Sequence, residues 1–362
     1  MNLKKLLQTL SEAPGPSGYE SPIAQIISTT WGEYTDEMRS DAMGNLIAVK
    51  KGEGEGPRPR ILLAAHMDEI ALLVTDILAY PDENGYGFLR VFKVGGVDTR
   101  QTYAQQVIVH GQRDLPGVIG CLPPHLIPEE RRDKPFEYLD LVVDVGLPYQ
   151  ELCQLVSVGD FVTFRQTLRE LANERVAGKS LDNRASVAAV TVCLDYLRGR
   201  KHSWDLLAVA TTQEEIGLRG AMAVAGGENP DIAIAIDVTW AKGPLAKDGG
   251  ITFELGEGPT LGYGPNVHPG IYKGLQNAAA ALELKVTPEA HAGQTGTDTS
   301  ALQVALAGIP TGLISIPQRY MHTMVETMAL SDIERTGRLL GEFIARLDAE
   351  FLRNLSQNWL DD

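Results

Sequence analysis

Hydrophobic positions divide the chain into three parts with different periodicities. In the first part, four leucines between Leu3 and Leu10 recur at helical spacing, which predicts an amphipathic helix. A second helix is expected from Ser21, because serine caps helices and Pro22 suits a first helical turn. The short apolar run from Ile61 to Ala65 is typical of a buried strand.

The middle part, residues 72–165, has a different character. Short strand-like runs such as FLRVFKV, QQVIVHG and LDLVVDVGL are separated by glycine and proline, and no helical periodicity interrupts them. This pattern is typical of a small all-β unit.

An alternation of helices and buried strands returns after Lys179. Apolar residues at 3–4 spacing mark a helix from Val187 to Leu197, and the runs 206–210, 232–236 and 311–316 indicate buried strands. A capping box of Ser331 and Glu334 is expected to start a last helix. The pattern predicts one α/β domain, residues 1–71 and 166–362, with a β-rich insert at 72–165.

Composition narrows the possible classes of protein. The 362 residues are 44% hydrophobic and 22% charged, as in an ordinary soluble domain, and no apolar run approaches the ~20 residues of a membrane span. The first residues lack the apolar core of a signal peptide, and the three cysteines form no CxxC pair, so we expect reduced thiols in the cytoplasm. A net charge of −15 argues against nucleic acid as a partner.

Acidic and histidine residues follow the predicted strands. His66 comes directly after the first strand, Glu214 and Glu215 follow the second, Asp237 ends the third, and His322 follows the fourth. Because ligands gather at the carboxyl ends of strands in open α/β sheets, we expect these groups to meet at one edge. Imidazole nitrogens and carboxylate oxygens are ligands that divalent ions prefer.

Taken singly, each of these residues has a simpler interpretation. Asp182 suits the N-terminus of the following helix as a cap, the glutamate pair suits a solvated helix start, and a lone histidine is more often a surface residue. The spacing of His66 and Asp68 is more specific, because residues two apart on an extended segment point the same way. Asp68 is then able to orient the imidazole of His66.

Several segments of the chain resemble the M42 family of dinuclear metal aminopeptidases. The matching segments span nearly the whole chain and are AAHMDEIALLVTDI, VGGVDTRQ, SLDNRAS, TTQEEIGLRGA, AIDVTWA, TGTDTSALQ and GIPTGLISIPQRYMHTMVE. The resemblance implies an αβα sandwich around a mixed sheet, with the insert as a small β domain used in oligomer contacts. It also implies a homo-oligomer, often a hollow dodecamer.

The resemblance assigns roles to individual residues. It implies two divalent ions per chain, zinc, cobalt or manganese, with Asp182 as the bridge between them. The remaining metal ligands that it implies are His66, Glu215, Asp237 and His322. Glu214 matches the general base, and Asp68 matches the residue that orients His66. The implied reaction is hydrolysis of the N-terminal peptide bond by water, with peptides as substrates and with no membrane partner.

Other interpretations remain open at this point. A related deacylase, carboxypeptidase or so-called endoglucanase uses similar ligands, and a non-catalytic metal-binding scaffold would keep the ligands without needing Glu214. Arg319 is a candidate for substrate binding, with a structural ion pair as the alternative. Asp298 is expected in a turn, with support of the site as the alternative, and His291 is not expected to be a ligand. Four further histidines are expected at the surface, namely His110, His125, His202 and His268.

The chain departs from the family pattern at three places. Thr323-Met324 follows the last histidine, Ala71 follows HMDEI, and Val97 stands within the block at 95–99. None of these changes removes a predicted ligand. They fall where walls of a substrate pocket are expected, so they bear on specificity.

Overall fold

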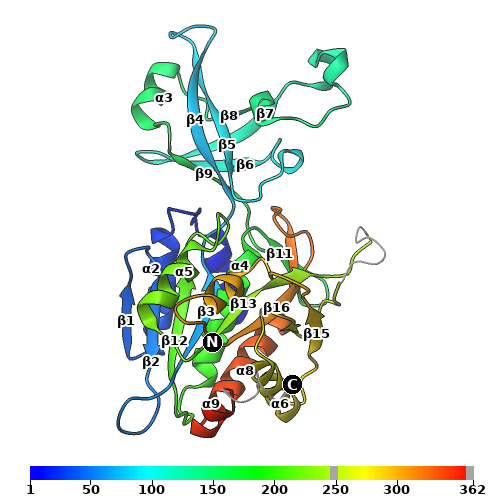
Figure 1. Cartoon of the computed structure of the whole chain (residues 1–362). Helices are drawn as coiled ribbons and strands as arrows, with labels where there is room; N and C mark the ends of the chain where they lie inside the picture. The colour runs from blue at the N-terminus through cyan, green and yellow to red at the C-terminus, as the bar shows by residue number, and fades with distance from the viewer. Residues whose placement is uncertain (245–251, 356–362) are drawn as a thin grey trace.

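The computed structural model describes residues 1–244 and 252–355, which form an α/β domain with a β-barrel above it (Figure 1). The predicted α/β domain extends to residue 362, so its last seven residues and residues 245–251 lie outside this description. The α-helices are α1 (Leu3–Glu12), α2 (Ser21–Trp31), α3 (Tyr149–Leu155), α4 (Leu181–Tyr196), α5 (Arg219–Glu228), α6 (Pro269–Ala281), α7 (Asp298–Gln303), α8 (Leu330–Arg346) and α9 (Ala349–Leu355).

An eight-stranded mixed sheet forms the centre of the α/β domain, in the order β1-β2-β12-β3-β13-β16-β14-β15. Its strands are β1 (Glu37–Ser40), β2 (Leu46–Lys50), β3 (Arg60–His66), β12 (Asp205–Thr211), β13 (Ile232–Trp240), β14 (Thr260–Tyr263), β15 (Thr287–Ala290) and β16 (Thr311–Gln318). The four middle strands β12, β3, β13 and β16 run parallel. Their carboxyl ends therefore point to the same edge of the sheet.

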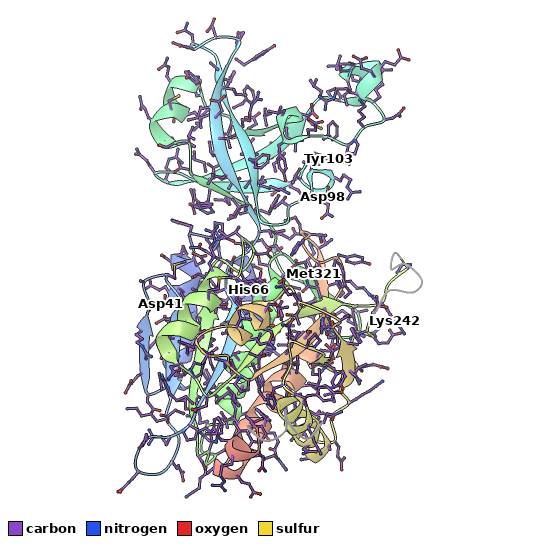
Figure 2. All side chains as sticks on the ribbon, viewed as in Figure 1. Asp41, His66, Asp98, Tyr103, Lys242 and Met321 are labelled. Carbon is purple, nitrogen blue, oxygen red and sulfur yellow. The ribbon has the colours of Figure 1, made fainter. Side chains whose placement is uncertain are left out.

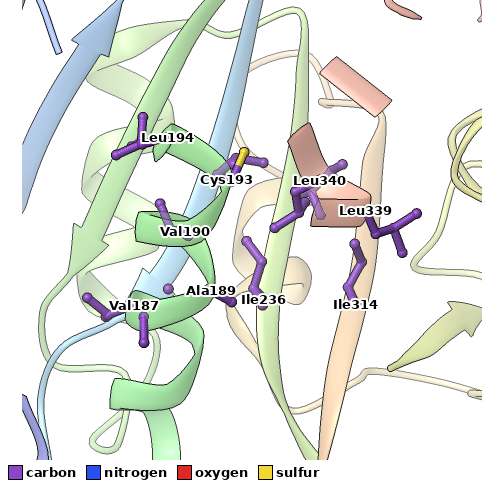
Figure 3. Close-up of a cluster of buried hydrophobic side chains, with 14 of the residues drawn as sticks. Val187, Ala189, Val190, Cys193, Leu194, Ile236, Ile314, Leu339 and Leu340 are labelled. Atoms are coloured by element: carbon purple, nitrogen blue, oxygen red, sulfur yellow. The ribbon is translucent and has the colours of Figure 1, made fainter. Parts of the chain in front are cut away.

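Both faces of the sheet are buried under helices, as expected for an αβα sandwich. Along β3, Ile61, Leu63 and Ala65 face a core shared with α1, α2, α4, α6 and α8, while Leu62 and Ala64 face a second core shared with α5 and α7. A strand covered on both sides is apolar at every position, which explains the continuous hydrophobic run seen in the sequence. Figure 3 shows α4 and α8 packed on β13 and β16 within the larger core.

The barrel closes in the order β4-β5-β8-β7-β6-β9. Its strands are β4 (Ala71–Tyr80), β5 (Tyr86–Val94), β6 (Gln106–His110), β7 (Asp114–Cys121), β8 (Leu141–Asp144) and β9 (Phe161–Phe164). Alternate side chains fill a separate apolar core, as closure of a small barrel requires. A third sheet contains β10 (Arg169–Leu171), β11 (Arg175–Gly178) and β17 (Glu326–Ala329). It lies beside the carboxyl edge of the central sheet, where β11 is labelled in Figure 1.

Three local expectations are corrected by the structure. Helix α8 begins at Leu330 with Ala329 as its N-cap and no capping side chain, so the predicted capping box is wrong. The N-cap of α2 is Glu20, whereas Pro22 lies in the first turn as expected. Asp237 lies inside β13 and does not end it, because the strand continues to Trp240 beside β16.

Candidate functional site

The candidate site lies at the carboxyl edge of the parallel strands, on the side that faces the barrel. His66 is the last residue of β3, and Glu214 and Glu215 follow β12 after a short turn. Figure 2 shows His66 and Met321 near this end of the α/β domain. Both residues line a cavity of about 660 Å³. The strand topology therefore gathers residues from distant parts of the sequence around one hollow.

His66 lies at the centre of the first group of ligand atoms. Its Nε2 is 3.1 Å from Oδ1 of Asp182 and 3.8 Å from Oε2 of Glu214. The side chain of His66 is buried, and Asp182 and Asp237 are buried with it. Ligand atoms of His66, Asp182 and Asp237 all lie within 4.8 Å of one another.

His322 forms the centre of a second group. Its Nε2 is 3.4 Å from Oδ2 of Asp182 and 3.5 Å from Oε1 of Glu215. Ligand atoms of these three residues also lie within 4.8 Å of one another. Asp182 therefore directs one carboxylate oxygen to each histidine and belongs to both groups.

Asp182 reaches this position because the start of α4 departs from helical geometry. The φ and ψ angles of Asp182 and of Asn183 are non-helical, and the N-cap of the helix is Ser180, not Asp182. The helix-cap interpretation of Asp182 is therefore not what the structure shows. The carboxylate instead points into the cavity between the two histidines.

The carboxylates crowd together with little compensating positive charge. Burial raises the pKa of Glu214 to about 10, and the charges of Asp237, Asp298 and Glu215 act in the same direction. Burial also raises the pKa of Glu215 to about 7, reinforced by Asp182. Such shifts mark a place where negative charge is unfavourable until a cation joins it.

The pKa values of the two histidines are also raised, which for an imidazole favours the charged form. The hydrogen bond to Asp182, opposed by burial, raises the pKa of His322 to about 9. Burial lowers the pKa of His66, but the carboxylates of Glu214, Asp182 and Asp68 outweigh it and place the pKa well above the usual value. Both imidazoles thus sit where positive charge is favoured, which is the electrostatic environment of a divalent cation.

Asp68 holds the loop that carries both glutamates. Its Oδ1 accepts a hydrogen bond of 3.0 Å from the backbone N–H of Glu214, and its Oδ2 accepts one of 3.2 Å from that of Glu215. Ser17 donates a further hydrogen bond of 2.6 Å to Oδ2. The same carboxylate lies 3.4 Å from Nδ1 of His66, so Asp68 connects β3 to the glutamate loop.

Glu326 is a residue of the site that the sequence did not single out. It is buried at the start of β17, and its Oε2 accepts a hydrogen bond of 3.0 Å from the backbone N–H of Asp182. Its Oε1 accepts one of 3.0 Å from the backbone N–H of His322. The only local signal was its place four residues after His322, within the segment HTMVE.

The barrel also contributes to the site, through the loop after β5. A Cβ on Gly96 would lie 2.4 Å from Nδ1 of His322, and one on Gly95 would lie 3.3 Å from Cβ of Glu215. Only glycine permits so close an approach of backbone to these side chains. The barrel loop thus limits where His322 and Glu215 can move.

Other predicted residues take different positions. Asp298 is buried, accepts a hydrogen bond of 2.6 Å from Thr211, and is the first residue of α7, not a turn residue. Burial raises the pKa of Asp298 to about 6. Arg319 lies outside the lining of the cavity, and its Nε donates to the backbone oxygen of Lys242. His291 lines the cavity but belongs to none of the three candidate metal groups among the described residues.

The expected surface position is wrong for two of the four other histidines. His202 and His268 are buried, and Nδ1 of His202 lies 2.8 Å from the backbone oxygen of Trp204. His110 is half-buried, and its Nδ1 lies 2.8 Å from Oδ1 of Asp114. Only His125 is exposed as expected.

Comparison with known proteins gives a consistent result. The sequence profile of the M42 glutamyl aminopeptidases matches residues 44–339. A lysyl aminopeptidase of Pyrococcus furiosus is 34% identical over 348 residues, which cover 95% of this chain and 97% of the relative. The two chains are therefore similar over nearly their whole lengths.

Solved structures agree with the sequence relatives. A TET aminopeptidase from a marine sediment Thaumarchaeota archaeon superposes with a TM-score of 0.88 at 30% identity, covering 98% of both chains. The TET1 peptidase of Pyrococcus horikoshii, which can assemble into a tetrahedron or a large octahedral shell, superposes with a TM-score of 0.82 at 33% identity. That match covers 96% of this chain and 100% of the other. The chain therefore belongs to the M42 family of metal-dependent aminopeptidases.

Proposed function

We propose that this aminopeptidase holds two divalent metal ions, zinc, cobalt or manganese, with Asp182 as the bridge between them. The observation that carries the proposal is the overlap of the two ligand groups. One group contains His66 and Asp237, the other contains Glu215 and His322, and Asp182 belongs to both. Imidazole and carboxylate donors suit all three metals.

The charges around these residues support the same proposal. Among residues 1–244 and 252–355, the ion-pair partners of Asp182, Glu214 and Glu215 are the histidines His66 and His322, and no lysine or arginine pairs with them. Buried carboxylates need a cationic or hydrogen-bonding partner. Bound divalent ions would supply the missing charge, lower the pKa of a water molecule and polarise the scissile carbonyl.

Glu214 is the proposed general base. Its Oε2 lies 3.8 Å from Nε2 of His66, so the carboxylate borders the place where ligand atoms converge. It accepts the proton of the attacking water as the new C–O bond forms, and it donates that proton to the amine nitrogen as the C–N bond breaks. A third candidate metal group, His66, Glu214 and Glu215, makes a ligand role for Glu214 the competing assignment.

The substrates proposed are peptides with a free N-terminus, cut one residue at a time. Carboxylates of Asp182, Glu214, Glu215 and Asp237 line the cavity, and we expect the α-amino group of the substrate to bind among them. Acetylation removes the basic lone pair of that amine and adds bulk, so a site built for the amine rejects the blocked peptide. A short peptide and its N-acetylated twin, compared by mass spectrometry, test this point. Equal cleavage rates would contradict it.

The proposed assembly is a homo-oligomer with contacts through the barrel. Relatives of the TET type assemble into large shells, and the barrel exposes large apolar side chains at Phe92, Leu122, Leu126 and Leu139. Light scattering at micromolar concentration should give a multiple of 39.3 kDa. We also propose that the protein works in the cytoplasm, where its three free cysteines would stay reduced. Within the described ranges, no helix is long and apolar enough to cross a membrane.

Metal analysis tests the central proposal. Wild-type protein reconstituted with zinc, cobalt or manganese should bind two ions per chain. Asp182→Asn should weaken binding of both ions, whereas His322→Gln should weaken only one. Exposed Glu334→Gln, on α8, is the matched control and should bind both. A stoichiometry of zero after reconstitution, or two tightly held ions in Asp182→Asn, would overturn the proposal.

A further inference from the structure

The cavity has a carboxylate that no metal-binding role explains. Glu289, in the edge strand β15, lines the same cavity as His66 and Asp237 and is 7% exposed. It belongs to none of the three groups of described residues that could hold an ion. Its carboxylate is therefore open to a role other than metal binding.

Two threonines fix the position of this carboxylate. Thr239 Oγ1 donates a hydrogen bond of 2.5 Å to Oε1 of Glu289, and Thr260 Oγ1 donates one of 2.5 Å to Oε2. Each oxygen accepts one of these hydrogen bonds and keeps a lone pair for another donor. Glu289 is thus held rigidly with capacity for one more cationic or N–H partner.

The two threonines that hold Glu289 lie near the proposed metal ligand Asp237 in the central sheet. Asp237 and Thr239 are two residues apart on β13, so their side chains share a face and lie about 6.6 Å apart along the strand. In the neighbouring strand Ser315 pairs with both Asp237 and Thr260, which places all three in one row across the sheet. The hydroxyl groups of Thr239 and Thr260, which donate hydrogen bonds to Glu289, therefore lie on the same face of the sheet as Asp237.

Apolar side chains also line the cavity that contains the proposed metal ligands and Glu289. Leu218, Leu313 and Met321 contribute to its wall. The cavity thus offers a side chain of the substrate both an aliphatic wall and the carboxylate of Glu289. Lysine has this composition, an apolar four-carbon stem that ends in a compact ammonium, and arginine is similar.

We propose that Glu289 makes the enzyme select peptides whose first residue is lysine or arginine. The inference rests on the proposed function, because it needs the scissile bond to lie at the metal ligands. An acidic first residue would place two carboxylates together and be rejected. Among the described residues, His291 also lies near this carboxylate, with its Nε2 3.7 Å from Oε1 of Glu289.

The test compares two substrates that differ only by the ammonium group. Lysyl and norleucyl p-nitroanilides share the same stem, so the ratio of their kcat/KM values isolates the charge. Metal-loaded wild-type enzyme should favour the lysyl substrate by about tenfold or more, and glutamyl p-nitroanilide should be the poorest of the three. High salt should reduce the lysyl preference only in part, because the pair is largely buried.

Glu289→Gln supplies the decisive variant. Its amide keeps one acceptor and one donor for the two threonines, so the side chain should stay in place. The negative charge is removed, so the lysyl-to-norleucyl ratio should fall about tenfold. The norleucyl kcat/KM should stay within about threefold, which also shows that the variant folds. His291→Gln should keep the preference for lysine, and exposed Glu334→Gln should match wild type.

The outcomes separate this inference from the function on which it rests. Loss of hydrolysis of every aminoacyl substrate by metal-loaded wild-type enzyme would overturn the proposed function. Hydrolysis with equal lysyl and norleucyl rates would overturn only the inference. An unchanged lysyl-to-norleucyl ratio in Glu289→Gln would do the same.

Discussion

Two clusters in the α/β domain, one around the carboxylate of Glu69 and one around His66 and His322, differ in their charge balance. In the first cluster, Oε2 of Glu69 accepts a hydrogen bond of 2.6 Å from Lys179 and a second from Ser180. Burial raises the pKa of Glu69, but the charges of Lys179 and Arg184 outweigh burial and lower it. This cluster contains its own cations.

The second cluster surrounds His66 and His322, and its shifts have the opposite sign. Burial raises the pKa values of Glu214 and Glu215, to about 10 and about 7. The side chains of Glu214 and Glu215 are 11% and 5% exposed and that of Glu69 is 3% exposed, so burial alone does not reverse the shift. Within the described part of the chain, no lysine or arginine pairs with the carboxylates of the second cluster. The comparison indicates which acidic cluster is structural and which one needs ions from outside.

Removing the ions, which we expect only in the second cluster, should have the largest effect on the free energy of unfolding. Each ion held at a concentration 100 times its dissociation constant stabilises the folded state by about 2.7 kcal/mol. Dialysis against a chelator should therefore lower the free energy of unfolding by about 5 kcal/mol for two ions, measured by urea denaturation. Restored stability on adding metal is the control. Equal stability with and without metal would contradict the comparison.

Breaking the first cluster should be nearly as damaging, and added metal should not correct it. Lys179→Met leaves Glu69 buried without its ion-pair partner, which costs about 3–5 kcal/mol of folding free energy. The double variant Glu69→Gln with Lys179→Met should recover part of this loss. The matched control is Lys4→Met, whose pair with Glu170 is exposed, and its stability should change by less than about 0.5 kcal/mol.

The next expected effect separates the two adjacent glutamates. Glu214→Gln should keep both ions and lose about 10²-fold or more in turnover, the scale of a lost general base. Glu215→Gln should instead weaken binding of one ion. Metal content and kcat, measured on the same preparations, check both expectations. If both variants lose metal, Glu214 is a ligand and not the base.

The smallest expected effect tests the barrel loop beside the second cluster. In Gly96→Ala the new Cβ would collide with His322, so affinity for one ion should fall by about tenfold. Gly226→Ala is the control, because a Cβ there meets nothing within 4 Å, and it should leave metal affinity unchanged. Calorimetric titration of metal-free protein measures both. An unaffected Gly96→Ala would show that the loop gives way without disturbing His322.

The sequence predicted the parts of the site that depend on local pattern. An apolar run followed by His66 or by the glutamate pair identifies a strand end, and parallel strands bring such ends together. The α/β class followed from the same pattern, because strands buried on both faces are continuously apolar, and the resemblance to the family implied the αβα sandwich. Resemblance to the family then linked Asp182 with both histidines.

The remaining parts depend on contacts between segments distant in sequence. Glu326 reaches Asp182 because β17 pairs with β11 just before α4, and no local pattern records that pairing. Glu289 reaches the cavity because β15 pairs beside β14. The predicted capping box failed for a related reason, since the antiparallel pairing of Ala329 with Arg175 extends β17 to the residue before α8.

The path of the chain into and out of the barrel has a consequence for the history of the fold. Strand β4 leaves the sheet region at Ala71 and pairs with β9, where Leu72 lies opposite Val162 and Leu73 opposite Phe161. The exit and the return are thus about one strand spacing apart, roughly 4.8 Å. A domain whose two ends lie close together can be inserted, lost or exchanged without changing the fold of the domain that carries it. Here a different inserted domain would also have to replace Gly96, which lies against His322. The barrel is therefore linked to the site through this contact.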